Sequence, residues 1–453
     1  MNTTENCGRT APALRPKIFD LRGKYTFKNF ISDLLSGLTV ASVTLPLGII
    51  LAIASGVEPV MGVLSSAVAA FACALLGGGQ LGVSGPAVIL TSVCLGVCSV
   101  SGPEGLVLST LLGGVLLILL AAFKLGRLIN CIPPTVLAGF TAGTVIALAI
   151  GQIKDLFGLS YAPGTVALLP VEKLAALFKN ATTVNLQALL IGGLSLAILL
   201  ICLKINKKIP GALIAILVTT VLIVGGEHLA KSGLLEEFHC SVSTVGHLYH
   251  IEAGFPSLAL DFSSLTLTDA PAILLGGVAI ALLSGMESLC TLSVLEEEPL
   301  EDSSTSTELF AQGIGNICAG LLGGLPVASS LERGLLNLKS GGKTPLSGII
   351  AAILLFLVLV ALMPFFALIP LPTVAAILLV AVLRACCIKQ WKKLLKNATQ
   401  TEGLLFFVTL LLTVILGTAL AAVAGTILSL VLSKSQAVKD RGQESSENPS
   451  KNP

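Results

Sequence analysis

Two acidic residues stand in stretches that are otherwise apolar enough to lie in a membrane. Glu287 belongs to the run GGVAIALLSGMESLCTLSVL, in which Ser284, Ser288 and Thr291 fall on the same helical face as the acid, at spacings of three and four residues. Lipid offers such a carboxylate no partner, so the polar stripe predicts an interior face that holds a proton or a coupling ion. A carboxylate that is merely hydrogen-bonded between helices is the structural alternative.

The second acid, Glu332, directly precedes Arg333 and follows a break with the sequence GGLP at 323–326. The Gly and Pro residues end one helix, and Val327 onward can begin another whose first N–H groups lie free at membrane depth. A helix N-terminus carries about half an elementary positive charge and binds anions. A broken helix, a guanidinium and a carboxylate in one short segment therefore predict an anion site in a transporter.

Glu332 changes the electrostatics of such a site. A carboxylate ~4 Å from a bound anion costs about 4 kcal/mol at an effective dielectric constant of ~20. Three arrangements avoid this repulsion: Glu332 pairs with Arg333, points away from the anion, or is protonated when the anion binds. Neighbouring residues on a helix diverge by ~100°, so a tight pair with Arg333 is the weakest of the three. Protonation would make the carrier a proton–anion symporter in which Glu332 or Glu287 exchanges the proton.

The composition is that of a membrane protein with many spans. The chain has 453 residues, of which 54% are hydrophobic and only 11% are charged, whereas soluble domains carry about 25% charged residues. The eleven cysteines lie mostly inside apolar runs and show no metal-ligand spacing. We therefore expect no metal and no cofactor. No set of nucleophile, base and acid is present, so an enzyme is not expected.

The apolar runs predict an all-α polytopic membrane protein with about 14 transmembrane segments in two inverted repeats of seven. The expected spans are 34–54, 60–77, 85–98, 105–123, 132–152, 184–203, 210–227, 271–294, 307–323, 328–339, 344–363, 371–387, 403–417 and 418–433. The third and the tenth are too short to cross ~30 Å of hydrocarbon, and each follows a proline. Equivalent short segments in two halves are typical of half-helices that meet at the bilayer midplane, with two ordinary kinked helices as the alternative.

The positions of the basic residues predict the orientation of the chain in the membrane, and polar stretches mark the parts that lie outside it. Residues 1–33 form a polar, basic N-terminal segment without a cleaved signal, 34–433 form the transmembrane domain, and 434–453 form a short polar tail expected to be disordered. Lys and Arg concentrate in alternate loops, which places both termini in the cytoplasm. The loop 153–183 is expected to lie outside although it contains Lys154, Lys173 and Lys179. We expect 229–270 to lie outside and the acidic stretch 296–308 to form a solvated inner loop.

A resemblance to a known family adds to this interpretation. The second half contains ELFAQGIGN at 308–316, then GGLP, then Arg333 seven residues after the proline, Asn337 four residues later, and SGGKTP at 340–345. The first half contains LPLGIILAIASGVEP and GVSGPA. Together these runs resemble the SulP anion permease family over roughly residues 30–433.

The resemblance implies a core domain and a gate domain that move as near-rigid bodies, with the anion between the half-helices of segments three and ten. The substrate site carried over by motif position comprises Leu47, Leu51, Ala87, Ser329, Ser330 and Arg333, and Ser84 is available beside it as a donor. The coupling-ion or proton site comprises Glu287 and Thr291, with Glu332 as the unusual acid. Sodium-coupled bicarbonate members of the family place their cation at positions that match Glu287, Thr291 and the start of segment ten.

Three features depart from the family pattern. Most members continue into a cytoplasmic STAS domain, and the tail here is too short for one, so we expect the membrane domain alone. Segment one has Leu47 where a Gln often follows the proline. Glu332 occupies a position that is usually small or hydroxylic.

We therefore expect a secondary active transporter of a small anion across a bacterial inner membrane. Sulfate is the generic substrate, with bicarbonate and C4-dicarboxylates left open. Proton symport ranks first because two acids flank the site, followed by sodium symport and anion exchange. The lipid bilayer is an expected partner, nucleic acid is not, and a homodimer is left open. The rivals are a nucleobase–proton symporter of the same fold, which uses one acid in segment eight and one in segment ten, and a membrane scaffold without transport.

Overall fold

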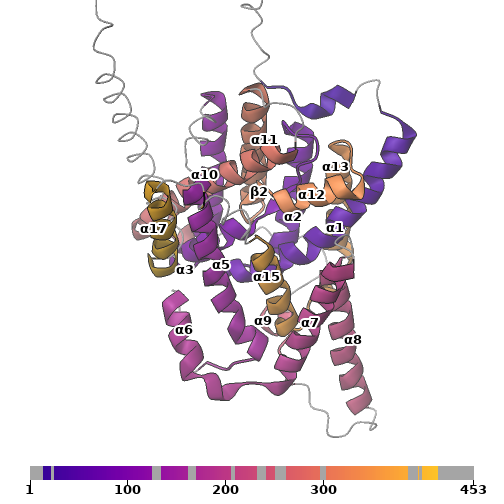
Figure 1. Ribbon diagram of the computed structural model, residues 1–453, viewed down its shortest axis with the longest axis vertical. Coiled ribbons are helices and arrows are strands. Elements are labelled where there is room, and N and C mark those ends of the chain that lie inside the picture. The colour runs from indigo at the N-terminus through magenta and orange to yellow at the C-terminus, as the bar shows by residue number, and fades with distance from the viewer. Residues whose placement is uncertain are drawn as a thin grey trace, which may run out of the picture.

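A computed structural model describes residues 14–21, 25–124, 134–161, 170–205, 210–231, 241–249, 262–295, 302–385, 396 and 400–416. These residues form helices of very different lengths and one short two-stranded sheet (Figure 1). Six helices of the described part are long and apolar enough to span a membrane, and four shorter apolar helices accompany them. The fold is that of an all-α polytopic membrane protein, as the composition predicts.

The first half of the chain contains most of the long helices. In order, they are α1 (Phe27–Ser55), α2 (Pro59–Leu76), strand β1 (Ser84–Pro86), α3 (Val88–Ala122), α5 (Pro134–Phe157), α6 (Pro170–Lys179), α7 (Leu186–Ile205) and α8 (Gly211–Lys231). Single 3-10 turns at Lys17–Leu21 and Ala181–Thr183 precede α1 and α7.

The second half repeats much of this order. It comprises α9 (Val245–Leu248), α10 (Ala270–Leu295), α11 (Asp302–Leu321), strand β2 (Val327–Ser329), α12 (Leu331–Ser340), α13 (Leu346–Ala361), α14 (Met363–Phe366), α15 (Leu371–Ala385) and α17 (Gln400–Leu416). Two 3-10 turns, Phe262–Ser264 and Leu267–Asp269, lead into α10.

Segments three and four are joined in one interrupted helix. Within α3, Gly102 has φ 68° and ψ −178°, a conformation that only glycine adopts readily, and Pro103 follows it. The predicted spans 85–98 and 105–123 therefore both exist, and they meet at this break. The first of them begins at Val88 rather than at residue 85, because the preceding three residues form β1.

The two half-helices are brought together by the sheet. Strands β1 and β2 pair antiparallel, with Ser84 opposite Ser329, Gly85 opposite Ala328, and Pro86 opposite Val327. Figure 1 shows β2 and α12 in the interior of the molecule, close to α2 and α1. The pairing satisfies backbone groups that would otherwise be orphaned in an apolar setting. The predicted half-helices of segments three and ten, which begin next to each other at this sheet, are thereby confirmed.

The two halves interlock. The part of α3 that follows Gly102 packs on α10 and α11, while α13 packs on α1 and α2. Each half thus places its fourth segment against the first two of the other. Small residues allow the close approach: a Cβ on Gly114 of α3 would lie 2.8 Å from the carbonyl oxygen of Gly313 in α11.

A second group of helices stands beside this interlocked body. Helix α5 packs on α15 and α17, and α7 packs on α8 and α15. A buried apolar cluster that includes Leu148, Leu199, Ala215 and Leu378 joins α5, α7, α8 and α15. We call the first body the core and the second the gate.

Several expected boundaries differ from the structure. Helix α1 begins at Phe27, before the predicted Leu34, because Thr26 caps it: its side chain accepts from the Asn29 N–H. The acidic stretch 296–308 was expected to be a loop, but α11 already begins at Asp302. The loop 153–183 contains the short helix α6. The fourteenth segment, 418–433, and the tail 434–453 lie outside the described residues.

Candidate functional site

The half-helices present their N-terminal ends at the sheet. Ala87 and Ser330 are the N-cap residues of α3 and α12, and both have extended backbone conformations. Neither N-cap side chain makes a capping hydrogen bond within the part of the chain that the structure describes. Apart from the Leu90 N–H, which donates to the Ala87 carbonyl oxygen at 3.0 Å, the first N–H groups of both helices are left for water or a ligand within the described residues. Both helix dipoles favour negative charge there.

The polar stripe on α10 faces the interior and holds β2. The Ser284 hydroxyl donates to the Val327 carbonyl oxygen at 2.6 Å, and the Thr291 hydroxyl donates to the Ser329 carbonyl oxygen at 2.9 Å. The Ser329 N–H donates to the Ser288 hydroxyl oxygen at 3.0 Å. The sequence placed these three side chains on one face. Thr291, expected near the coupling ion, already has a structural hydrogen bond, and its role toward an ion stays a prediction.

Glu287 is the acid on the same face. Its Oε2 atom is buried and has no hydrogen-bond partner among the described residues. A buried carboxylate oxygen without a donor is unfavourable in the ionised form, so this atom is suited to take up a proton or a cation.

We call the paired strands β1 and β2, with the starts of α3 and α12, the crossing. The ELxxQGxxN motif of α11 supports this crossing from the side opposite α10. The Asn316 amide donates to the Val327 carbonyl oxygen at 3.0 Å and accepts from the Val327 N–H at 2.9 Å. Gln312 donates to the Ser84 hydroxyl at 2.7 Å and to the Glu308 carboxylate at 2.9 Å. Ser84, expected as a donor to the anion, is thus also an acceptor in a buried network. The motif shapes the site without entering it.

Arg333 is almost completely buried, at 3% exposure, and is bound to the sheet. Its guanidinium donates to the carbonyl oxygens of Val83 (3.2 Å), Pro86 (2.8 Å), Gly85 (3.0 Å) and Ala328 (3.1 Å). Four of its five N–H donors are therefore engaged with the backbone around β1 and β2. Direct contact of Arg333 with the anion stays a prediction. Its charge nevertheless lies at the crossing.

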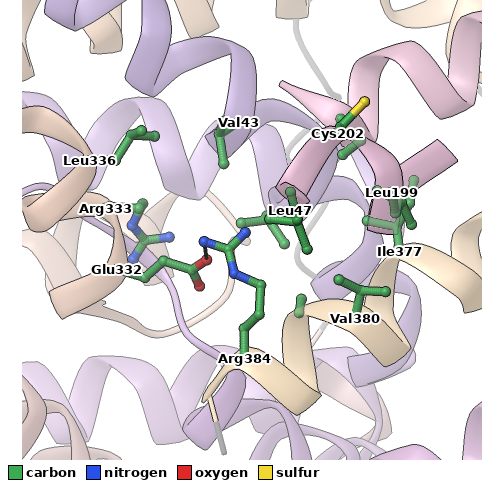
Figure 2. Close-up of a pocket in the computed structure, with 14 residues that line it drawn as sticks. Val43, Leu47, Leu199, Cys202, Glu332, Arg333, Leu336, Ile377, Val380 and Arg384 are labelled. Atoms are coloured by element: carbon green, nitrogen blue, oxygen red, sulfur yellow. Dashed lines mark ion pairs between the residues drawn. The ribbon is translucent and has the colours of Figure 1, made fainter. Parts of the chain in front are cut away.

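Glu332 finds a partner that the sequence did not suggest. The Arg384 guanidinium of α15 lies 2.6 Å from the Glu332 carboxylate, and the two side chains point toward each other across a pocket (Figure 2). The carboxylate does not pair with Arg333. Residues 332 and 384 belong to different helices with no shared spacing, so the only signal in the sequence was a single arginine near the end of the predicted span 371–387.

The pocket lies between the core and the gate. Its cavity volume is about 70 Å³. It is lined by Val43, Leu47, Leu199, Cys202, Leu203, Gly211, Ala212, Glu332, Arg333, Leu336, Ile377, Val380, Ala381 and Arg384. The walls are mostly apolar, and their charges come from α12 and α15 alone in the described part.

The predicted site residues fall into two groups. Leu47, Glu332 and Arg333 line the pocket. Others lie outside this lining: Ser84 and Ser329 pair in the sheet, Ser330 is the N-cap residue of α12 without a side-chain cap, and Leu51 and Ala87 are buried in apolar clusters. The substrate and coupling roles of all these residues stay predictions.

Comparison with known proteins finds a matching family and similar sequences. A model of the sulfate permease family matches residues 30–411. YvdB, a candidate sulfate transporter of Bacillus subtilis, is 31% identical over 90% of this chain and 74% of its own. The bicarbonate transporter BicA of a Picosynechococcus strain is 28% identical over 91% of this chain and 71% of its own.

Solved structures agree with the fold. The transmembrane domain of a cyanobacterial BicA superposes with a TM-score of 0.72 at 27% identity, covering 88% of this chain and 99% of that domain. Murine Slc26a9 in an inward-facing state gives a TM-score of 0.79 at 16% identity over 96% of this chain and 74% of its own, which shows the shared fold alone. With the family match, these likenesses show that the chain belongs to the sulfate permease family of membrane anion transporters, which is not a family of enzymes.

Proposed function

We propose that this protein is a secondary active transporter that carries a small oxyanion by alternating access, with a proton as the coupling ion. Sulfate is the substrate we place first, and bicarbonate and C4-dicarboxylates are the other candidates. The membrane is a bacterial inner membrane, with both termini in the cytoplasm.

The two uncapped helix N-termini support the anion as substrate. They converge on β1 and β2, and the charge of Arg333 lies between them. Backbone N–H groups and dipoles recognise the shared oxygen geometry of sulfate, bicarbonate and carboxylates. Relatives that align over about nine tenths of this chain are named as sulfate and bicarbonate transporters, which supports this class of ligand without choosing within it.

The unpartnered Oε2 of Glu287 is the observation that supports coupling. A carboxylate in this state gains most by binding a proton, because protonation removes the charge and supplies a donor. A sodium ion could satisfy the same oxygen. Proton coupling ranks first because Glu332, the second acid, lies on the first turn of α12 beside the same site.

Flux measurements in liposomes test the proposal. Uptake of labelled sulfate, bicarbonate and succinate is measured with the purified protein under an imposed proton gradient, a sodium gradient, or neither. We expect uptake of one anion to rise with an inward proton gradient. Uptake that responds only to sodium would transfer the coupling role to that ion. Loss of anion uptake in the presence of uracil or xanthine would favour a nucleobase carrier.

Glu287→Gln separates coupling from binding. The variant should lose gradient-driven uptake yet keep counterflow, which needs no net proton movement. Ser293→Ala is the matched control, since Ser293 is exposed on the same helix and its hydroxyl, among the described residues, donates to the Leu289 carbonyl oxygen of its own helix. If Glu287→Gln keeps full gradient-driven uptake, Glu287 does not carry the proton.

A further inference from the structure

The pocket between core and gate contains one cation whose partner can be exchanged. Arg333 is committed to four backbone carbonyl oxygens. Arg384 instead reaches from α15 into the pocket and is paired there with a side-chain carboxylate, that of Glu332 (Figure 2). Its guanidinium has a fork of donors that matches a carboxylate or another planar or tetrahedral oxyanion.

The position of the Glu332 carboxylate is the position that an anion would favour. Glu332 is in the first turn of α12, next to a helix N-terminus without a side-chain cap. Its carboxylate therefore lies between a positive helix end and a guanidinium, inside walls that are mainly apolar, such as Leu47 and Ile377.

We propose that Arg384 binds the transported anion and that Glu332 is a tethered competitor that occupies Arg384 while the pocket is empty. The inference rests on the proposed function and extends it to a residue of the gate. The pair is only partly buried, with side-chain exposures of 43% for Arg384 and 32% for Glu332. Part-exposed pairs are weak, so a mobile anion can displace the carboxylate.

This competition explains how an acid is tolerated in an anion pocket. Glu332 does not repel the substrate from a fixed site; it vacates Arg384 when the substrate arrives. Because Arg384 belongs to the gate and the α12 N-terminus to the core, a bound anion would contact both bodies. Anions too large to fit between them, or too weakly charged to displace a carboxylate, would be excluded, so the pair also sets selectivity.

Equilibrium binding tests the competition directly. The dissociation constant of sulfate is measured by thermal-shift titration of the detergent-purified full chain, as wild type, Glu332→Gln, Arg384→Gln and the double variant. Bicarbonate and succinate serve as alternative probes. We expect Glu332→Gln to bind about tenfold more tightly, because Arg384 is freed, and Arg384→Gln to bind more weakly by at least about tenfold. The double variant should match Arg384→Gln.

A purely structural pair predicts a different pattern. If the ion pair only fastened α12 to α15, both single variants would lower the melting temperature alike, and neither would change the dissociation constant. That result would overturn the inference, as would weaker binding in Glu332→Gln. Arg384→Lys should bind with intermediate affinity, since an ammonium keeps the charge and loses the fork. Lys339→Gln is the matched control, because it removes a positive charge from the exposed face of α12 outside the pocket.

The binding measurement also separates this inference from the proposed function. If the protein binds an anion with the expected ratios but shows no flux, the transport proposal fails and the role of Arg384 holds. If flux is present and the four dissociation constants are equal, the role of Arg384 fails alone. If neither the wild type nor Glu332→Gln binds any of the three anions, both fail.

Discussion

The two bodies on either side of the pocket are built in opposite ways. On the core side, β1 and β2 are held by directional hydrogen bonds from three helices: the Ser284 and Thr291 hydroxyls of α10, the Asn316 amide of α11 and the Arg333 guanidinium of α12. On the gate side, the lining from α7, α8 and α15 is apolar except for Arg384 and the thiol of Cys202.

The difference assigns rigidity and movement to different parts. Hydrogen bonds depend on angle and distance, so the crossing resists any shift of one strand against the other. Apolar contacts have no preferred direction, and a surface of leucine, isoleucine and valine can slide with little loss of free energy. The structure therefore suits a carrier whose binding site stays intact while the gate moves past it, with the Glu332–Arg384 pair as the polar contact to be exchanged.

The largest expected effect is that of Arg333→Ala. The change leaves four backbone carbonyl oxygens around the sheet without their donor, so the crossing should lose on the order of 4 kcal/mol of stability. We expect a lower melting temperature in detergent and no measurable uptake. Arg333→Lys should recover only part of both, because an ammonium cannot reach four acceptors. A variant that melts like the wild type but binds anions poorly would show instead that Arg333 serves the substrate.

Asn316→Leu tests the crossing from the side of α11. Leucine is similar in volume and removes both hydrogen bonds to Val327, which leaves a buried N–H and a buried carbonyl oxygen less satisfied. We expect a loss of about 3 kcal/mol, read as an earlier unfolding transition on heating. An unchanged transition would mean that the sheet and α10 suffice to hold β2.

Gly85→Val sharpens the geometry of the crossing. A Cβ on Gly85 would lie 3.2 Å from Nη1 of Arg333, so valine must push the guanidinium away from its acceptors. We expect a loss of about 2 kcal/mol and uptake reduced by more than about tenfold. Gly96→Val, in the helix α3 that follows β1, is the control because a Cβ there meets no heavy atom within 4 Å. Equal uptake in the two variants would show that Arg333 can move without loss of transport.

The smallest expected loss of stability is that of Thr373→Val in the gate. The Thr373 hydroxyl lies between those of Ser195 and Thr219, 3.0 Å from each, and Ser195 and Thr219 also bond to helix carbonyl oxygens. Thr373→Val should therefore cost only about 1 kcal/mol and leave the anion affinity unchanged. A loss as large as that of Asn316→Leu would remove the contrast between a rigid core and a sliding gate.

The sequence could predict the parts of this site that depend on local pattern. The proline-led short segments predicted half-helices, and the three- and four-residue spacing predicted that Ser284, Glu287, Ser288 and Thr291 share an interior face. Both follow from helix geometry within a single segment.

The remaining features depend on contacts between distant segments. The register of Ser84 against Ser329 joins residues about 245 positions apart, and no local spacing encodes such a pairing. Arg384 could not be matched to Glu332 because which face of α15 meets α12 is decided by packing. For the same reason, the sequence could not show that Arg333 donates to the backbone carbonyl oxygens around β1 and β2.

The interlocked halves have a consequence for how the protein is made. The last part of α3, up to Ala122, leaves the ribosome long before α11 is complete at Leu321, so its packing surface for α10 and α11 has no partner during that time. At roughly 5–20 residues per second, about 200 residues take on the order of 10–40 s to synthesise. Over this interval the nascent first half must remain in the bilayer with the Gly114 face of α3 uncovered, accessible to lipid or to a second nascent chain. Assembly of the crossing therefore becomes possible only once the second half has been inserted.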